Sequence, residues 1–157
     1  MTDCSRFLPL SNRPRGDDGG VTRNWARPAS GLLLSLAKIP SPEVAALDAD
    51  RLAPALRAEA MSLSGATARC SVREFGEILV AALDLGTALE VDLGVDPFAS
   101  GAVAVDLAVR APTPRRSVLT ARTLVAVDSE WQVGTGPALP ATASSIVLFL
   151  AGRGATS

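Results

Sequence analysis

The sequence contains no histidine and no tyrosine among its 157 residues. Histidine is the one side chain whose unperturbed pKa lies near neutral pH, and it is the commonest protein ligand for metals. Its absence excludes Ser-His-Asp and Cys-His catalytic sites and every His-containing zinc site. The two cysteines, Cys4 and Cys70, cannot hold a structural zinc alone. We interpret them as reduced cytosolic thiols rather than as a disulfide scaffold.

Clustered charge and long apolar runs are also missing. Fifteen Lys and Arg residues face sixteen Asp and Glu residues, for a formal net charge of −1. Nucleic-acid binding needs a basic stripe, and the pair Arg115–Arg116 is too small to form one, so we expect no nucleic-acid partner. No stretch approaches the roughly 20 apolar residues of a membrane span. The start of the chain also lacks the apolar region of a signal peptide. These absences predict a cytoplasmic protein without a membrane span.

The residues that are present favour one domain with an aliphatic core. The apolar fraction is 48%, but the aromatic residues are only four Phe and two Trp. Arginine outnumbers lysine fourteen to one, which indicates the coding bias of a GC-rich bacterium. Residues 1–22 are rich in Pro, Gly and charge, and such a segment buries too little apolar surface to offset its ordering entropy. We therefore predict a disordered tail over 1–22.

Residues 23–112 are patterned as helices. An apolar run that ends at Pro40 predicts a short helix near 29–38. A second helical pattern follows over 41–63. We expect Pro54 to divide it, because proline lacks an amide donor and clashes with the preceding turn. Asp50 would then cap the second piece.

Two helix starts carry stronger signals. Ser71 and Glu74 have the spacing of a capping box directly before an apolar run, which predicts a helix to about Leu89. Asp96 followed by Pro97 is the favoured pairing of an N-cap with a proline in the first turn. That pairing predicts a helix over about 97–110.

After Pro114 the apolar period changes to two. This pattern predicts a strand over 117–127 and a short antiparallel return strand over 131–134, followed by a loop. A final helix over 143–151 would begin at a Thr142 or Ser144 cap and end at Gly152. The expected fold class is therefore α+β, with helices followed by a small α/β region over 113–157 built on an antiparallel hairpin.

Three stretches, in this order, carry a resemblance. "EILVAALDLGTALE" at 77–90 is similar to a helix written E-x-x-V-H-x-W-D-L-x-x-A-L-G. "GVDP" before a helix follows, and then "VDSEWQVGTGPALPATASSIVLFLAGR" at 127–153 matches a closing Trp-x-Val-Gly strand and a helix that ends Leu-x-Gly-Arg. Over 71–153 the chain thus resembles the mycothiol-dependent maleylpyruvate isomerase family of the DinB-like group. The early stretch "TRNWARPASGLLLSLAKI" resembles the family's first helix more weakly.

The resemblance implies a helical bundle, zinc held by two histidines and one glutamate, the thiol cofactor mycothiol, and a C-terminal domain like the sterol carrier fold. The glutamate position is Glu77, but the paired histidine position is Ala81. The other histidine would fall near Leu33 or Ser35. We therefore expect no metal site, no bound cofactor and no catalytic residue, since Glu77 alone matches.

Two acids on the family helix have alternative interpretations. Glu77 is either a surviving ligand or a surface charge paired with Arg73 at i−4. Asp84 is either simply exposed or a structural or binding residue, with Arg153 as its candidate partner.

Two further residues need a role. Trp131 at the hairpin is expected to fill the core or a sheet face rather than to bind a ligand. Cys70 precedes a helix start, where the amides stabilise a thiolate. It is therefore either a reactive thiol or a buried inert one.

Three functions follow from different classes. The first is a degenerate or truncated family member without metal-dependent catalysis. The second is a binding module for a small apolar ligand or a partner chain, with a homo-oligomer as one form. The third is an active thiol-dependent isomerase or transferase that uses Cys70 or another recruited group.

Overall fold

The computed structural model describes residues 24–39 and 49–153. Its helices and strands confirm the α+β class, with a small sheet at the C-terminal end. The predicted tail over 1–22 and the first part of the 41–63 pattern lie outside the described residues. The elements in chain order are α2 (Ala26–Leu36), α4 (Ala49–Ser64), α5 (Val72–Ala88), α6 (Pro97–Arg110), α7 (Thr113–Ala121), β1 (Thr123–Ala126), β2 (Gln132–Gly134), β3 (Ala138–Ala141) and α8 (Ala143–Ala151).

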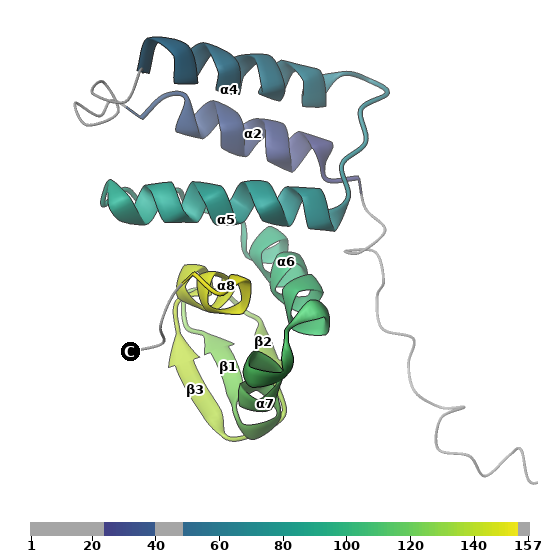
Figure 1. Ribbon diagram of the computed structural model, residues 1–157, viewed down its shortest axis with the longest axis vertical. Helices are drawn as coiled ribbons and strands as arrows, with labels where there is room; N and C mark the ends of the chain where they lie inside the picture. Colours follow the sequence, from purple (N-terminus) through teal and green to yellow (C-terminus); the bar gives the residue numbers. More distant parts are fainter. Residues whose placement is uncertain (1–23, 40–48, 154–157) are drawn as a thin grey trace, which may run out of the picture.

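Helices α4, α2 and α5 lie side by side in one layer, with α2 in the middle (Figure 1). Small residues allow α2 and α4 to approach closely: Ala29 is fully buried, and the Ser30 hydroxyl donates to the Ala60 carbonyl at 2.8 Å. Helix α2 covers 26–36, whereas the sequence predicted 29–38. It starts earlier because Trp25 is buried, and its ring stacks on Phe75 of α5 with the ring centroids 5.1 Å apart.

Helix α4 runs without interruption through Pro54. It begins at Ala49, so Asp50 lies in the first turn instead of capping it. Pro54 is the sixth residue of α4, so it removes only the one hydrogen bond that its amide would have donated to the Asp50 carbonyl, and the helix continues through it. The predicted start of the second piece is therefore correct to within two residues.

The capping signals of α5 and α6 are confirmed. The Ser71 hydroxyl accepts from the Glu74 amide at 3.2 Å, and the Glu74 carboxylate accepts from the Ser71 amide at 2.8 Å. The Ser71 amide and the Ser71 hydroxyl both donate to the Glu74 carboxylate, and these two hydrogen bonds lower the pKa of Glu74. The Asp96 carboxylate accepts from the Ala99 amide at 2.9 Å, and Pro97 begins α6. Both starts follow from local chemistry alone, which explains why the sequence predicted them.

The predicted strand over 117–127 is wrong in its first half. Residues 113–121 form helix α7, and β1 covers only 123–126. Pro114 lies in the first turn of α7, where its fixed φ suits a helix. The weak alternation of apolar and polar residues before residue 122 therefore did not indicate a strand. It belongs to an exposed helix whose buried side chain is Leu119.

The sheet is mixed rather than purely antiparallel. Strand β2 pairs antiparallel with β1 as predicted, in the register Leu124↔Val133. Strand β3 pairs with β1 in parallel on its other side, in the register Leu124↔Leu139, and gives the order β2-β1-β3. This segment was predicted to be a loop, and it instead forms a strand. Pro140 is tolerated because β3 is an edge strand.

Glycines hold the loop between β2 and β3 against the end of α7. Gly134 has φ +119°, and a Cβ atom there would lie 2.1 Å from the Arg122 carbonyl oxygen. A Cβ atom on Gly136 would lie 2.0 Å from the Ala121 carbonyl oxygen. The "VGTGP" stretch therefore needs both glycines for this close backbone approach.

Helix α8 closes the core as predicted. Thr142 caps its start by accepting from the Ser145 amide at 3.2 Å, and Gly152 ends it in the left-handed conformation. Ile146, Val147 and Leu150 are each at most 1% exposed. Helix α8 lies between the sheet and the α5–α6 pair, so it joins the helical layer to the strands (Figure 1).

Candidate functional site

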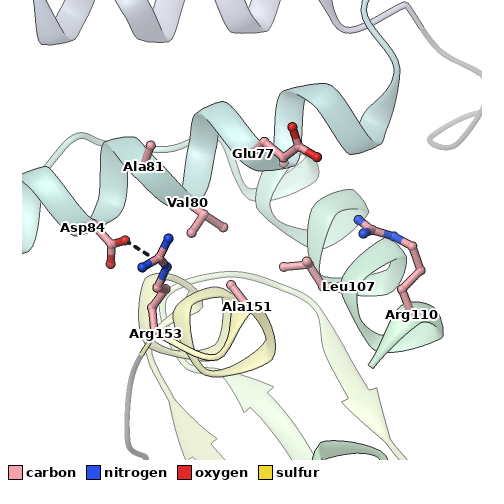
Figure 2. Close-up of a pocket in the computed structure, with 9 residues that line it drawn as sticks. Glu77, Val80, Ala81, Asp84, Leu107, Arg110, Ala151 and Arg153 are labelled. Atoms are coloured by element: carbon pink, nitrogen blue, oxygen red, sulfur yellow. Dashed lines mark ion pairs between the residues drawn. The ribbon is translucent and has the colours of Figure 1, made fainter. Parts of the chain in front are cut away.

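A cavity of about 310 Å³ opens between α5, α6 and the end of α8 (Figure 2). It lies on the face of α5 that carries Glu77 and Ala81, the two positions to which the resemblance assigns metal ligands. Valine, leucine and alanine side chains form its floor, and four charged side chains surround them (Figure 2). We call this cavity the α5–α8 groove. Its lining consists of Gly76, Glu77, Val80, Ala81, Asp84, Leu107, Arg110, Ala151 and Arg153.

The helix period brings the α5 residues of the groove together. Glu77, Ala81 and Asp84 are spaced at i, i+4 and i+7, which places them on one face of the helix. Gly76 lets α6 approach α5, because a Cβ atom there would lie 3.3 Å from a methyl group of Val103. The groove exists because α5 and α6 meet at Gly76 while α8 packs across both helices.

Each charged side chain of the groove has an oppositely charged neighbour. Glu77 pairs with Arg73 at 3.5 Å, and both side chains are about 70% exposed. Asp84 pairs with Arg153 at 3.5 Å, which is one of the two alternatives given for Asp84 and connects α5 to the end of α8 (Figure 2). These exposed pairs each contribute at most about 1 kcal/mol to stability. They nevertheless leave the groove without an unpaired charge on α5.

Arg110, on the opposite side of the groove, also has a partner. Its guanidinium donates to the Asp106 carboxylate one turn earlier on α6, with Nε 3.1 Å from Oδ2. This hydrogen bond raises the pKa of Arg110. Sequence reasoning missed Arg110 as a groove residue. The i, i+4 spacing of Asp106 and Arg110 could have suggested the ion pair, but only the packing of α6 beside α5 brings it to the groove.

The residues of the groove do not fit the zinc that the resemblance implies. Glu77 is largely exposed and paired, and the methyl group of Ala81 offers no lone pair where the family has histidine. Leu33 is buried in α2, and the Ser35 hydroxyl donates to the Gly31 carbonyl of the same helix. Over the described part of the chain, no three His, Cys, Asp or Glu side chains gather closely enough to hold a metal ion. Zinc needs three or four such ligands.

Trp131 joins the hairpin to α6. Its indole Nε1 donates to the Ser100 hydroxyl at 3.0 Å, and its ring lies against Gly101, where a Cβ atom would meet it at 3.2 Å. Ser100 is 2% exposed and in turn donates to the Pro97 carbonyl. The tryptophan therefore lies in a structural contact between β2 and α6, away from the α5–α8 groove.

Cys70 lies in the core instead of the groove. It is 4% exposed, and its Sγ is 3.6 Å from the Ser71 carbonyl oxygen. Burial raises the pKa of the Cys70 thiol, the nearby Glu74 carboxylate raises it further, and the amide of Phe75 lowers it by less. Of the two interpretations of Cys70, its burial therefore favours the inert thiol, because desolvation outweighs the helix amides.

Comparisons with protein-family models, with curated proteins and with solved structures found no match. None of the helices within 24–39 and 49–153 has the length and apolarity to cross a membrane.

The raised pKa predicts slow alkylation of Cys70. In a Cys4→Ser variant, we expect iodoacetamide to label the folded protein at least about tenfold more slowly than the urea-unfolded protein at pH 8, since only the thiolate reacts. In both states the labelling rate should rise with pH as the thiol ionises. The midpoint of that rise should lie at a higher pH in the folded protein than in the unfolded protein. Mass spectrometry of quenched samples measures both rates. Equal rates in the two states would contradict the burial of this thiol.

Proposed function

We propose that this chain is a non-catalytic protein of the mycothiol-dependent maleylpyruvate isomerase type, which keeps a binding groove at the former metal face. The observation that carries the proposal is the composition of the α5–α8 groove. An alanine occupies the position of the paired histidine, and every acid on this face of α5 is neutralised by an arginine. A cytoplasmic location belongs to the same proposal.

Two features of the described residues support the loss of catalysis. In the family, a metal supplies the Lewis acid that turns a bound thiol into a thiolate. The donor set around Glu77 and Ala81 does not fit such a metal. Cys70, the one candidate for a replacement nucleophile in the described core, has a raised pKa and is buried. Neither route to a thiolate at neutral pH is supported.

The shape and charge of the groove favour a small, largely apolar ligand. Val80, Leu107 and Ala151 form its floor, and its volume of about 310 Å³ is at the lower end of that of small-molecule sites. Glu77, Asp84, Arg110 and Arg153 surround the floor with balanced charge. A strongly charged ligand would have to displace an existing ion pair. An uncharged one would only displace water from an apolar surface.

The absence of an activated thiolate predicts no isomerase activity. We expect the purified protein, supplied with zinc, mycothiol and maleylpyruvate, to show no turnover above the uncatalysed rate. An Ala81→His variant should be equally inactive, because residues 33 and 35 supply no third ligand. The loss of maleylpyruvate absorbance measures the rate. Turnover by the unmodified protein would refute the non-catalytic proposal.

Filling the groove should abolish binding of an uncharged apolar probe. We expect Nile red to bind the unmodified protein saturably, and an Ala81→Trp variant to bind it at least about tenfold more weakly, because the indole occupies the groove. Ala88→Trp is the matched control, since Ala88 is also exposed on α5, two turns further on and outside the groove lining. Fluorescence titration measures both affinities. Equal loss in the two variants, or no saturable binding, would contradict a binding role for this groove.

A further inference from the structure

The solvent-facing side of α6 carries a row of apolar side chains. Phe98, Val105 and Val109 are 48%, 47% and 72% exposed, and Ala102 between them is half-buried. The opposite side of the helix packs into the core through four fully buried residues, Ala99, Ser100, Val103 and Ala104. We call the four outward residues 98, 102, 105 and 109 the α6 stripe.

The α6 stripe is unusual for the outer face of a surface helix. Such a helix normally carries polar residues opposite its buried face. A continuous row of exposed apolar side chains is typical of an interaction site. The stripe also differs from the α5–α8 groove, which α6 lines with Leu107 and Arg110. If the α6 stripe is a binding surface, its partner is therefore different from the ligand of the α5–α8 groove.

We propose that the α6 stripe binds the α6 stripe of a second copy of this chain in an antiparallel pair. The spacing of the stripe is four, three and four residues, so it has the same sequence of spacings from either end. A two-fold axis near the middle of α6 then places Val109 of one copy opposite Phe98 of the other, and Val105 opposite Ala102. An interface of two identical patches requires this self-complementarity. The small Ala102 beside the axis allows the helices to approach closely.

The charges at the two ends of α6 select the antiparallel direction. Asp92 and Asp96 are exposed at its N-terminal end, and Arg116 is exposed beyond its C-terminal end, where Arg110 is already paired with Asp106. An antiparallel pair brings the acidic end of each copy beside the basic end of the other. A parallel pair would instead place like charges together. The helix dipoles favour the same antiparallel arrangement.

The size of the stripe indicates a weak dimer. Eleven residues separate its ends, which is a rise of roughly 16 Å along one helix. Stable interfaces bury about 800 Å² per partner, more than one such stripe provides. Phe98 is held at the N-terminal end by stacking on Trp25, with ring centroids 5.8 Å apart. Because this contact already restricts the Phe98 ring, the side chain loses less conformational entropy when two copies associate.

Sedimentation equilibrium over a wide concentration range tests the dimer on the full chain. We expect a reversible monomer–dimer equilibrium for the unmodified protein, and at least about a tenfold weaker association for Val105→Glu and for Val109→Glu. Val127→Glu is the matched control, because Val127 is 65% exposed but follows β1, away from α6. It should dimerise like the unmodified protein. Circular dichroism and melting temperature check the fold of each variant.

Three outcomes would overturn the proposal. The unmodified protein stays monomeric at every concentration; or neither α6 variant weakens association; or Val127→Glu weakens it as much as they do.

Disulfide formation in a Cys4→Ser background tests the direction. In the antiparallel pair the two copies of residue 105 are offset by roughly 4.5 Å along the helices, and those of residue 109 by roughly 16 Å. Under mild oxidation, Val105→Cys should therefore cross-link and Val109→Cys should not. Equal cross-linking of both variants would indicate a parallel pair, and no cross-linking from Val105→Cys would contradict the contact itself.

Discussion

One buried side chain, Trp25, holds the first helices of this molecule together. Its ring stacks on Phe75 of α5 and on Phe98 of α6, and it is 1% exposed. Its amide also donates to the Cys70 carbonyl at 2.9 Å, which fixes the start of α2 beside the start of α5. In a chain with six aromatic residues, three of them meet at this point. The positions of α2, α5 and α6 therefore depend on aromatic packing, while the rest of the core is aliphatic.

The groove follows from this arrangement and from one glycine. With α5 and α6 fixed at Trp25, Gly76 allows their close contact further along, and α8 packs across both helices. The face of α5 that bears Glu77 and Ala81 then opens toward the end of α8 instead of toward a set of metal ligands. Arg153, placed by the left-handed turn at Gly152, reaches Asp84 from that end. The pairing of charges and the apolar floor thus arise from the same packing.

Sequence reasoning worked where a structure depends on neighbours within one turn. The Ser71–Glu74 capping box, the Asp96–Pro97 start and the Thr142 cap are such features. It failed where the partner is distant along the chain. Strand β3 forms only because β1 offers it a free edge, which the sequence of "ALPA" does not reveal.

The features of the candidate site also fall into those that the sequence could predict and those that it could not. The prediction that the ligand set implied by the resemblance is missing needed only the absence of histidine and the alanine at position 81, and both are visible in the sequence. The Asp84–Arg153 pair was one of two alternatives. The position of Arg110 at the groove and the depth of the groove could not be predicted, because both depend on the distance between α5 and α6 in the folded protein. Cys70 was open in the sequence because its burial depends on Trp25 and the core around it.

We propose that the face of α5 that bears Glu77 and Ala81 binds no metal. A titration of the ¹⁵N-labelled protein with zinc, followed through the amide resonances of residues 76–84, measures this directly. The account predicts no saturable shift centred on Glu77 and Ala81, and only the weak, non-specific changes of an exposed carboxylate. A shift that saturates at one zinc per chain and is centred on these residues would contradict it.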